Sequence, residues 1–197
     1  GMEILFSVYS PSGKHSAKAL SGDLEKMMRA QKKFLGPINA NKKYTVLLYL
    51  SDMKKKDAKG FGALEHNTST TVVFPEMMPS SALGKQIIDV VSHEFFHIVT
   101  PLSIHSEEIG SFDFNEPKMS KHLWLYEGLT EYAAHHMQAK YELTTWNDFF
   151  KTIQEKKENM DMHYDAAIPF TVMSQQVLSK YKEQYGNVYQ KGADRKS

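Results

Sequence analysis

The pattern of apolar and polar residues along this chain changes character near residue 83. In the first part, helical spacing of apolar residues predicts a helix over 16–35, which Gly36 and Pro37 end. The apolar and β-branched run over 44–50 predicts a strand buried on both faces. Residues 61–74 are rich in threonine and valine, which predicts an extended segment or a hairpin.

From residue 83 onward the pattern is helical. A strongly apolar helix is expected over 83–100, where Pro101 closes it, followed by an irregular connection over 101–120. Ser120 is a suitable N-cap for a helix over 121–140.

Two more helices are expected after this one. Thr145 with Asp148 has the spacing of a capping box and opens a helix to about residue 157; a last helical stretch covers 172–183. Strands first and helices later predict an α+β fold: one domain over 1–197, with an α/β lobe at about 1–82 and a helical lobe at about 83–197.

Composition narrows the function classes. The net charge is only +1, so we expect no nucleic-acid partner, and no apolar run approaches the roughly 20 residues of a membrane span. Cysteine is absent, which excludes disulfides and thiolate metal ligands and leaves the compartment open. Gly1 precedes Met2, so we expect that the natural N-terminus is not represented.

The motif His93-Glu94-Phe95-Phe96-His97 carries the first candidate chemistry. On a helix its two histidines lie one turn apart on one face, so both imidazoles can reach a single ion. Glu94 is then placed to hold a metal-bound water, and zinc suits two imidazoles with a carboxylate. Such a short motif also occurs by chance, and its alternative is a buried helix with one solvent-facing histidine edge.

A third zinc ligand is expected on the following helix. Glu127 stands there, with 29 residues between it and His97. Glu131 lies one turn further along the same face, where it could accept a hydrogen bond from a ligand histidine. The alternative for Glu131 is an exposed helix acid.

With its spacer, HEFFH followed by LWLYEG resembles the glycyl aminopeptidase family of gluzincin metallopeptidases, relatives of aminopeptidase N with a thermolysin-like catalytic fold. Residues 62–66, GALEH, are similar to the GAMEN segment of aminopeptidase N. The resemblance implies that Glu65 holds the substrate's α-amine and that Gly62 and Ala63 line the cleft. YQKGA is similar to a YxKGA segment, which implies that Tyr189 donates a hydrogen bond to the developing oxyanion.

The resemblance implies a zinc aminopeptidase with one zinc per chain in a cleft between the lobes, Glu94 as general base and a preference for small N-terminal residues. It also implies flanking domains, so we expect a fragment of a longer protein against which those domains pack. An endopeptidase is the alternative if Glu65 does not face the cleft. A non-catalytic zinc- and peptide-binding domain is another. A carboxylate-bridged di-iron bundle fits poorly, because it needs two Glu-x-x-His elements and only Glu94–His97 matches.

Overall fold

The computed structural model describes residues 1–38, 41–54 and 57–194. The chain forms two compact units, Gly1–Ile98 and Val99–Ser197, and each is described by itself below. This division falls later in the chain than the lobe boundary expected at residues 82 and 83. The helix that carries the His-Glu-x-x-His motif therefore belongs with the strands.

The first unit is built on a four-stranded sheet with strand order β1-β2-β4-β3. β1 and β2 pair in parallel, as do β2 and β4, while β3 and β4 form an antiparallel hairpin. The predicted strand and hairpin are confirmed, whereas the first strand has no counterpart among the predicted elements. The strands are β1 (Glu3–Tyr9), β2 (Lys43–Ser51), β3 (Gly62–His66) and β4 (Ser69–Pro75).

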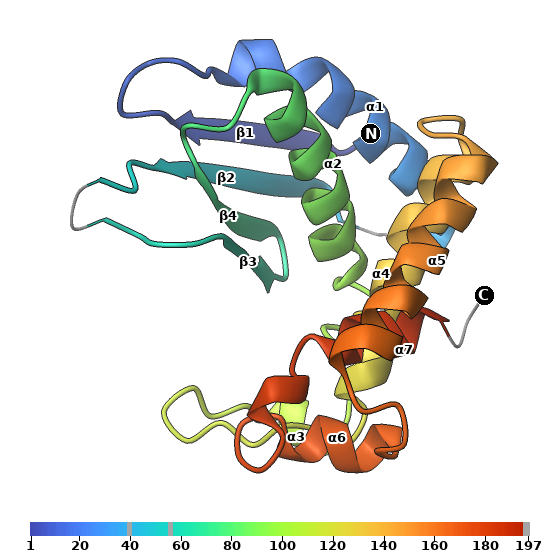
Figure 1. Cartoon of the computed structure of the whole chain (residues 1–197). Coiled ribbons are helices and arrows are strands. Elements are labelled where there is room, and N and C mark those ends of the chain that lie inside the picture. The colour runs from blue at the N-terminus through green and yellow to red at the C-terminus, as the bar shows by residue number, and fades with distance from the viewer. Residues whose placement is uncertain (39–40, 55–56, 195–197) are drawn as a thin grey trace. The chain divides into compact units, whose positions relative to one another are not determined.

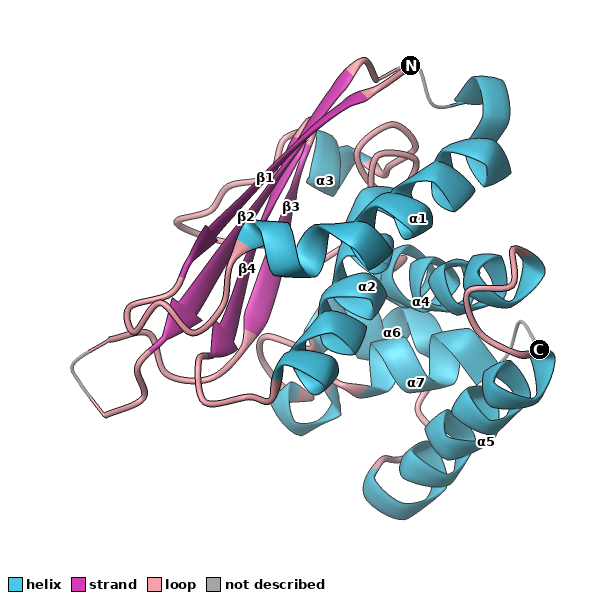
Figure 2. Cartoon of the chain, turned by 90° about the horizontal axis from the view of Figure 1, so that it is seen from above, coloured by secondary structure: helices cyan, strands magenta, loops and turns pink. Residues whose placement is uncertain are grey.

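Two helices, α1 (Ala17–Leu35) and α2 (Ser80–Phe96), cover one face of this sheet (Figures 1 and 2). Alternate β2 residues point into that core and are buried, namely Tyr44, Val46, Leu48 and Leu50. Leu47, which lies between Val46 and Leu48 in the sequence, is 42% exposed on the opposite face. The prediction that this strand is buried on both faces is therefore wrong, because the helices of the first unit lie on one face alone.

The second unit is helical. Its helices are α3 (Glu107–Gly110), α4 (Leu123–Lys140), α5 (Trp146–His163), α6 (Phe170–Gln176) and α7 (Asn187–Asp194), with a 3₁₀ turn at Lys182–Gln184. The capping box of Thr145 and Asp148 is present at the start of α5, as predicted, although α5 runs beyond residue 157. The predicted last helix over 172–183 is instead the shorter α6 followed by turns.

The predicted N-cap of α4 is wrong. The hydroxyl of Ser120 accepts a hydrogen bond from the backbone N–H of His122, at 3.1 Å, and one from the hydroxyl of Ser106, at 2.8 Å. These bonds build a turn before the helix, so α4 begins at Leu123 with His122 in the cap position.

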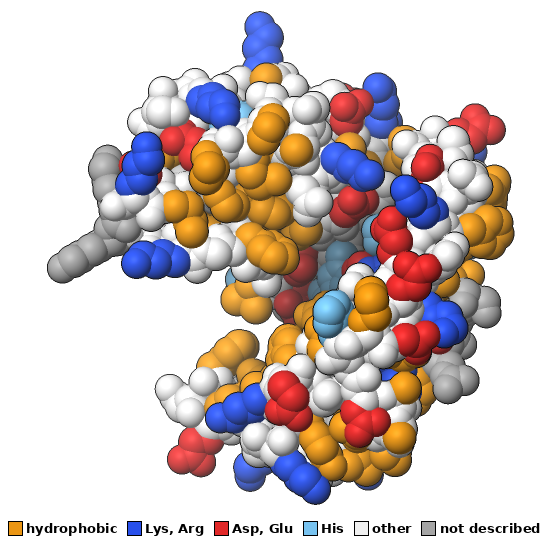
Figure 3. All heavy atoms as spheres, viewed as in Figure 1, with side chains coloured by type: hydrophobic (Ala, Val, Ile, Leu, Met, Phe, Trp, Pro, Cys, Tyr) orange, Lys and Arg blue, Asp and Glu red, His pale blue; other side chains and the backbone are white. Residues whose placement is uncertain are grey.

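The surface agrees with the near-neutral composition. On the face shown in Figure 3, basic and acidic side chains are interspersed and do not separate into patches of one sign. Among the described residues, no helix has the length and apolar character needed to cross a membrane. Sheet and helices together confirm the predicted α+β class.

Candidate active site

The last turn of α2 carries a buried cluster of metal-binding side chains. His93 and Glu94 are each 7% exposed and His97 is 2% exposed. One ligand atom from each lies within 4.8 Å of the others, and the two imidazole rings have centroids 4.7 Å apart. Two nitrogen ligands on one zinc ion lie about 3.3 Å apart, so side chains of these types at this spacing form a candidate metal site. The structure thus brings together three of the residues that the sequence motif singled out.

The motif ends its helix and does not lie inside it. His97 occupies the C-cap position, and its backbone N–H is bonded to the carbonyl of Glu94 at 3.2 Å. The helix predicted to reach residue 100 therefore stops at Phe96. Pro101 lacks a donor, crowds the carbonyl four residues before it and disfavours helical geometry at Thr100, so its influence extends upstream of the proline itself. A helix C-terminus is partially negative, which favours a cation at this position.

Packing inside the first unit holds the motif in place. The rings of Phe95 and Tyr44 meet edge to face with centroids 4.8 Å apart. The side-chain amide of Gln31, on α1, donates to the carbonyl of Ser92 at 2.7 Å. A core aromatic and a buried hydrogen bond therefore fix the orientation of the helix face opposite the histidines.

The buried hydroxyl of Tyr44 lies within range of the charges of both Glu94 and Glu65, the latter on β3. This hydroxyl has no hydrogen-bond partner among the described residues. Burial raises the pKa of Tyr44 well above its usual range, and the charges of Glu94 and Glu65 raise it further. The two carboxylates predicted to act in the site therefore both lie near one hydroxyl in the first unit.

Strand β3 presents Glu65 toward the helix-covered face of the sheet. Ala63 and Glu65 pair with Val72 and Thr70, which are buried on that face, while Leu64 between them is exposed. Strand β3 is also an edge strand in the order β1-β2-β4-β3. An edge strand can pair with an extended peptide, as the GAMEN-like role of residues 62–66 requires.

In the second unit, Glu127 and Glu131 lie one turn apart on α4. Glu127 is half-buried. The Glu131 carboxylate atom Oε1 lies 2.6 Å from the ammonium of Lys156, on α5, and 3.1 Å from Nε2 of His135. No sequence signal indicated Lys156, because it lies on a different helix far along the chain. The predicted hydrogen bond from a ligand histidine to Glu131 stays a prediction.

Tyr189 lies on α7, which crosses α4 at a pair of glycines. A Cβ added at Gly128 would lie 2.3 Å from the Cα of Gly192, and one added at Gly192 would lie 2.5 Å from the Trp124 carbonyl oxygen. Only glycine permits so close a backbone approach. The helices that carry Glu127 and Tyr189 are therefore in close backbone contact near both residues.

Lys191, also on α7, is buried and was not among the predicted site residues. Its ammonium donates to the carbonyls of Ala166 and Ile168, at 2.6 and 2.8 Å, and lies 4.8 Å from the centre of the Phe170 ring. These contacts tie the segment before α6 to the helix that carries Tyr189. The lysine in the YQKGA segment therefore has a structural role.

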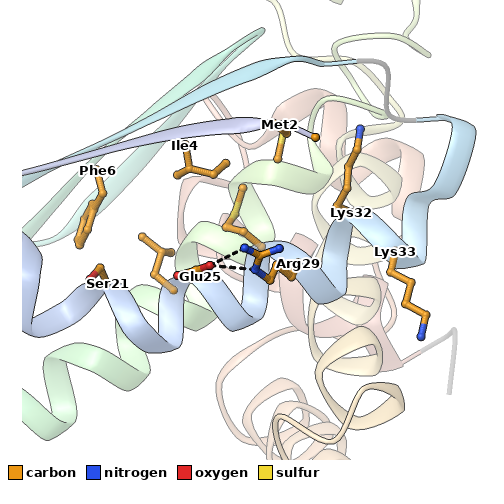
Figure 4. A pocket seen from close by; sticks show the side chains of 11 residues that line it. Met2, Ile4, Phe6, Ser21, Glu25, Arg29, Lys32 and Lys33 are labelled. Atoms are coloured by element: carbon orange, nitrogen blue, oxygen red, sulfur yellow. Dashed lines mark hydrogen bonds and ion pairs between the residues drawn. The ribbon is translucent and has the colours of Figure 1, made fainter.

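A pocket of about 670 Å³ in the first unit contains none of the predicted site residues. It lies between β1 and α1, where Ile4 and Phe6 face the helix and the ion pair of Glu25 and Arg29 lines it (Figure 4).

Comparison with known proteins places this arrangement in a family. No curated protein matches the chain. A solved aminopeptidase N family protein from Idiomarina loihiensis is similar over 96% of the chain, with 19% identity and a TM-score of 0.72. This likeness shows a shared fold, and the chain spans 33% of that structure's chain.

The model of the M61 glycyl aminopeptidase family matches residues 86–194. That range contains the buried cluster of α2, both acids of α4 and Tyr189, and it covers more than half of the chain. The resemblance inferred from the HEFFH and LWLYEG segments is thereby confirmed. This chain belongs to the M61 glycyl aminopeptidase family.

Proposed function

We propose that this chain is the catalytic part of a zinc-dependent peptidase with a thermolysin-like architecture, and that it acts as an aminopeptidase on small N-terminal residues. The buried cluster of His93, Glu94 and His97 is the observation that carries the proposal. Family membership supports it, because the family is one of peptidases. The solved relative is longer, so we further propose that flanking domains of the full-length protein pack against this chain.

His93 and His97 from the first unit and Glu127 from the second would hold one zinc ion. Bound zinc supplies a Lewis acid, which polarises the scissile carbonyl and lowers the pKa of water. Glu94 is not one of these three proposed ligands, so its carboxylate can act as a base. It takes the proton of the attacking water and passes it to the leaving amine.

Two further residues act on the peptide itself. Tyr189 donates a hydrogen bond to the oxyanion as it develops, a contribution of roughly 3 kcal/mol for a well-placed donor. Glu65 pairs with the substrate's α-ammonium at the edge strand, with Gly62 and Ala63 lining the cleft beside it. A carboxylate in that place restricts cleavage to the N-terminal residue.

The first test measures zinc per chain by elemental analysis, together with hydrolysis by the wild type and Glu94→Gln. We expect about one zinc per chain, lost to a chelator, in both proteins. The amide of the variant cannot accept the water's proton, so hydrolysis should fall by at least 10²-fold, on the order of a lost general base. Glu155→Gln, an exposed acid on α5, is the matched control and should hydrolyse as the wild type does.

The substrate panel of the same experiment separates the alternatives. Peptides that begin with glycine or alanine should be cleaved, and the same peptides with an acetylated N-terminus should not. Equal cleavage of both sets would indicate an endopeptidase. Zinc and peptide binding with no hydrolysis by the wild type would indicate a binding domain, and unchanged turnover in Glu94→Gln would refute the mechanism.

A further inference from the structure

Strand β1 forms an edge of the sheet that is open to a further strand in the described part of the first unit. It stands at the end of the order β1-β2-β4-β3 and pairs with β2 alone. Its register with β2 is unbroken, it contains no proline, and its one charged residue, Glu3, pairs with Lys43 of β2. Edge strands without such protection readily pair with another extended segment.

The backbone groups at this edge follow from one hydrogen bond. The N–H of Glu3 donates to the carbonyl of Lys42, on the β2 side, at 2.8 Å. Successive residues of a strand direct their backbone groups to opposite edges, so the N–H and carbonyl groups of Ile4, Phe6 and Val8 point away from β2. An added strand would meet a donor and an acceptor at every second residue of β1.

The pocket between β1 and α1 lies along the same strand (Figure 4). Ile4 and Phe6 face this pocket and are only half-buried, whereas Tyr44 and Val46, their partners on β2, are buried. The apolar layer between the sheet and its helices is therefore incomplete at β1. The volume of about 670 Å³ is sufficient for several apolar side chains.

One flank of α1 faces the pocket along its length. Ser21, Glu25 and Arg29 line the pocket at intervals of about one helical turn. Leu24 and Met28 of the same helix are buried and add apolar surface to the lining. The inward side chains of an added strand would thus have a helix to pack against, as those of β2 do.

The pocket is basic at one end. Lys32 and Lys33 lie at the end nearest Met2 (Figure 4). Among the described residues that line the pocket, Glu25 is the one acid, and its carboxylate accepts a hydrogen bond from Arg29 at 2.7 Å. An occupant with apolar groups along its middle and a carboxylate at this end would match both features.

We propose that the β1 edge binds an extended acidic segment of another protein as a fifth strand of the sheet. Main-chain hydrogen bonds to β1 supply affinity, apolar side chains fill the pocket, and a carboxylate pairs with Lys32 and Lys33. A second copy of this chain fits less well, because the pocket face of its own β1 carries no acid. A fatty-acid-like anion would leave the backbone groups of the edge without a protein partner. The proposal is independent of the zinc site.

The probe is a fluorescein-labelled peptide of about nine residues, enough to span the seven of β1. Leucine alternates with serine along it, a glutamate stands at each end, and both termini are blocked. Leucines and glutamates then share one face, and the symmetric sequence presents a carboxylate to the lysines in either strand direction. Anisotropy measures affinity, and amide hydrogen exchange followed by NMR locates the bound peptide. We expect the amides of Ile4 and Phe6 to gain protection, and a peptide with glutamine in place of glutamate to bind more weakly.

Two variants with matched controls test the contacts. Lys32→Glu/Lys33→Glu should weaken binding about 10-fold, whereas Lys18→Glu, at an exposed α1 position outside the pocket, should bind as the wild type does. Val8→Pro removes one donor from the open edge and should weaken binding about 5-fold. Val8→Ala keeps that donor and should retain most of the affinity. Unfolding in urea checks that each variant is folded, and the lysine variant serves if Val8→Pro is not.

Four results would overturn the proposal. They are no binding at about 1 mM peptide, binding without protection of the β1 amides, equal affinity for the glutamine peptide, and wild-type affinity in the lysine variant. Binding of decanoate but not of the peptide would make the pocket a site for an amphipathic anion instead. Dimers that form without peptide and protect the β1 amides would assign the edge to a second copy. A chelator should leave peptide binding unchanged, so this test and that of the proposed peptidase fail separately.

Discussion

At the scale of single residues, helices α4 and α7 meet through backbone atoms. Gly128 and Gly192 bring the backbones of α4 and α7 into contact, and each glycine stands beside a residue or segment of the proposed site. Glu127 directly precedes the first, and Tyr189 lies one turn before the second. A glycine at each of these places serves close packing, since neither has a positive φ.

Gly128→Ala should therefore destabilise the protein. The added methyl would meet the backbone of Gly192 at 2.3 Å, and backbone cannot move aside as a side chain can. Overpacking of this kind costs about 1–3 kcal/mol, measured as the loss in the free energy of unfolding in urea. Gly22→Ala is the matched control. A methyl there has open space on helix α1, so it should add roughly 0.5–1 kcal/mol of stability. Equal stability of Gly128→Ala and the wild type would show that the helices can separate freely.

At the scale of elements, the contact of α4 with α5 depends on an imidazole packed among aromatic rings. The His136 ring stacks on Tyr132 with centroids 5.7 Å apart and meets Trp146 and Phe149 at 5.6 and 5.9 Å. Burial in this cluster, and secondarily the charge of Lys140, lowers the pKa of His136. The folded protein thus favours the neutral ring.

This shift predicts the direction of a pH effect on stability. An unfolded histidine takes up a proton near pH 6.5, while the folded His136 resists protonation until the pH is lower. Between those two values the unfolded state binds more protons, so stability falls as the pH drops through this window. Unfolding in urea at steps between pH 7.5 and 5 should show the decline, and His136→Gln should reduce it. His122→Gln is the control, and an undiminished decline in His136→Gln would assign the effect to other groups.

Sequence patterns predicted the elements whose signals are local. Thr145 and Asp148 form their capping box because both halves of the motif lie within one turn. The start of α4 was misplaced because Ser106, well upstream, bonds to the Ser120 hydroxyl. The β1 strand was missed because apolar residues, Leu5 and Tyr9, also stand at its exposed positions, which leaves a weak alternation in the sequence. Lys156 and the Tyr44 hydroxyl could not be found at all, since the carboxylates near them come from other elements.

At the scale of the whole molecule, the proposed zinc ligands come from both compact units. His93 and His97 lie in Gly1–Ile98, whereas Glu127 lies in Val99–Ser197. A ligand that binds only the folded state adds about 2.7 kcal/mol of stability at a concentration 100 times its dissociation constant. If all three residues hold the ion, this stabilisation must reach both units.

The chain offers a direct reporter for that prediction, because its two tryptophans, Trp124 and Trp146, both lie in the second unit. Zinc should raise the melting temperature detected by tryptophan fluorescence, by roughly 2–4 °C per kcal/mol for a protein of this size, and a chelator should reverse the rise. Glu127→Gln should remove most of this rise while leaving the zinc-free melting temperature nearly unchanged. Zinc that binds without moving the tryptophan signal would mean that the histidines hold it without Glu127. If the zinc-induced rise in melting temperature disappears in Glu127→Gln, the ion bound by the histidines of α2 also stabilises the second unit through Glu127. The reason is that both tryptophans that report the melting lie in the second unit, on α4 and α5, whereas the histidines lie in the first.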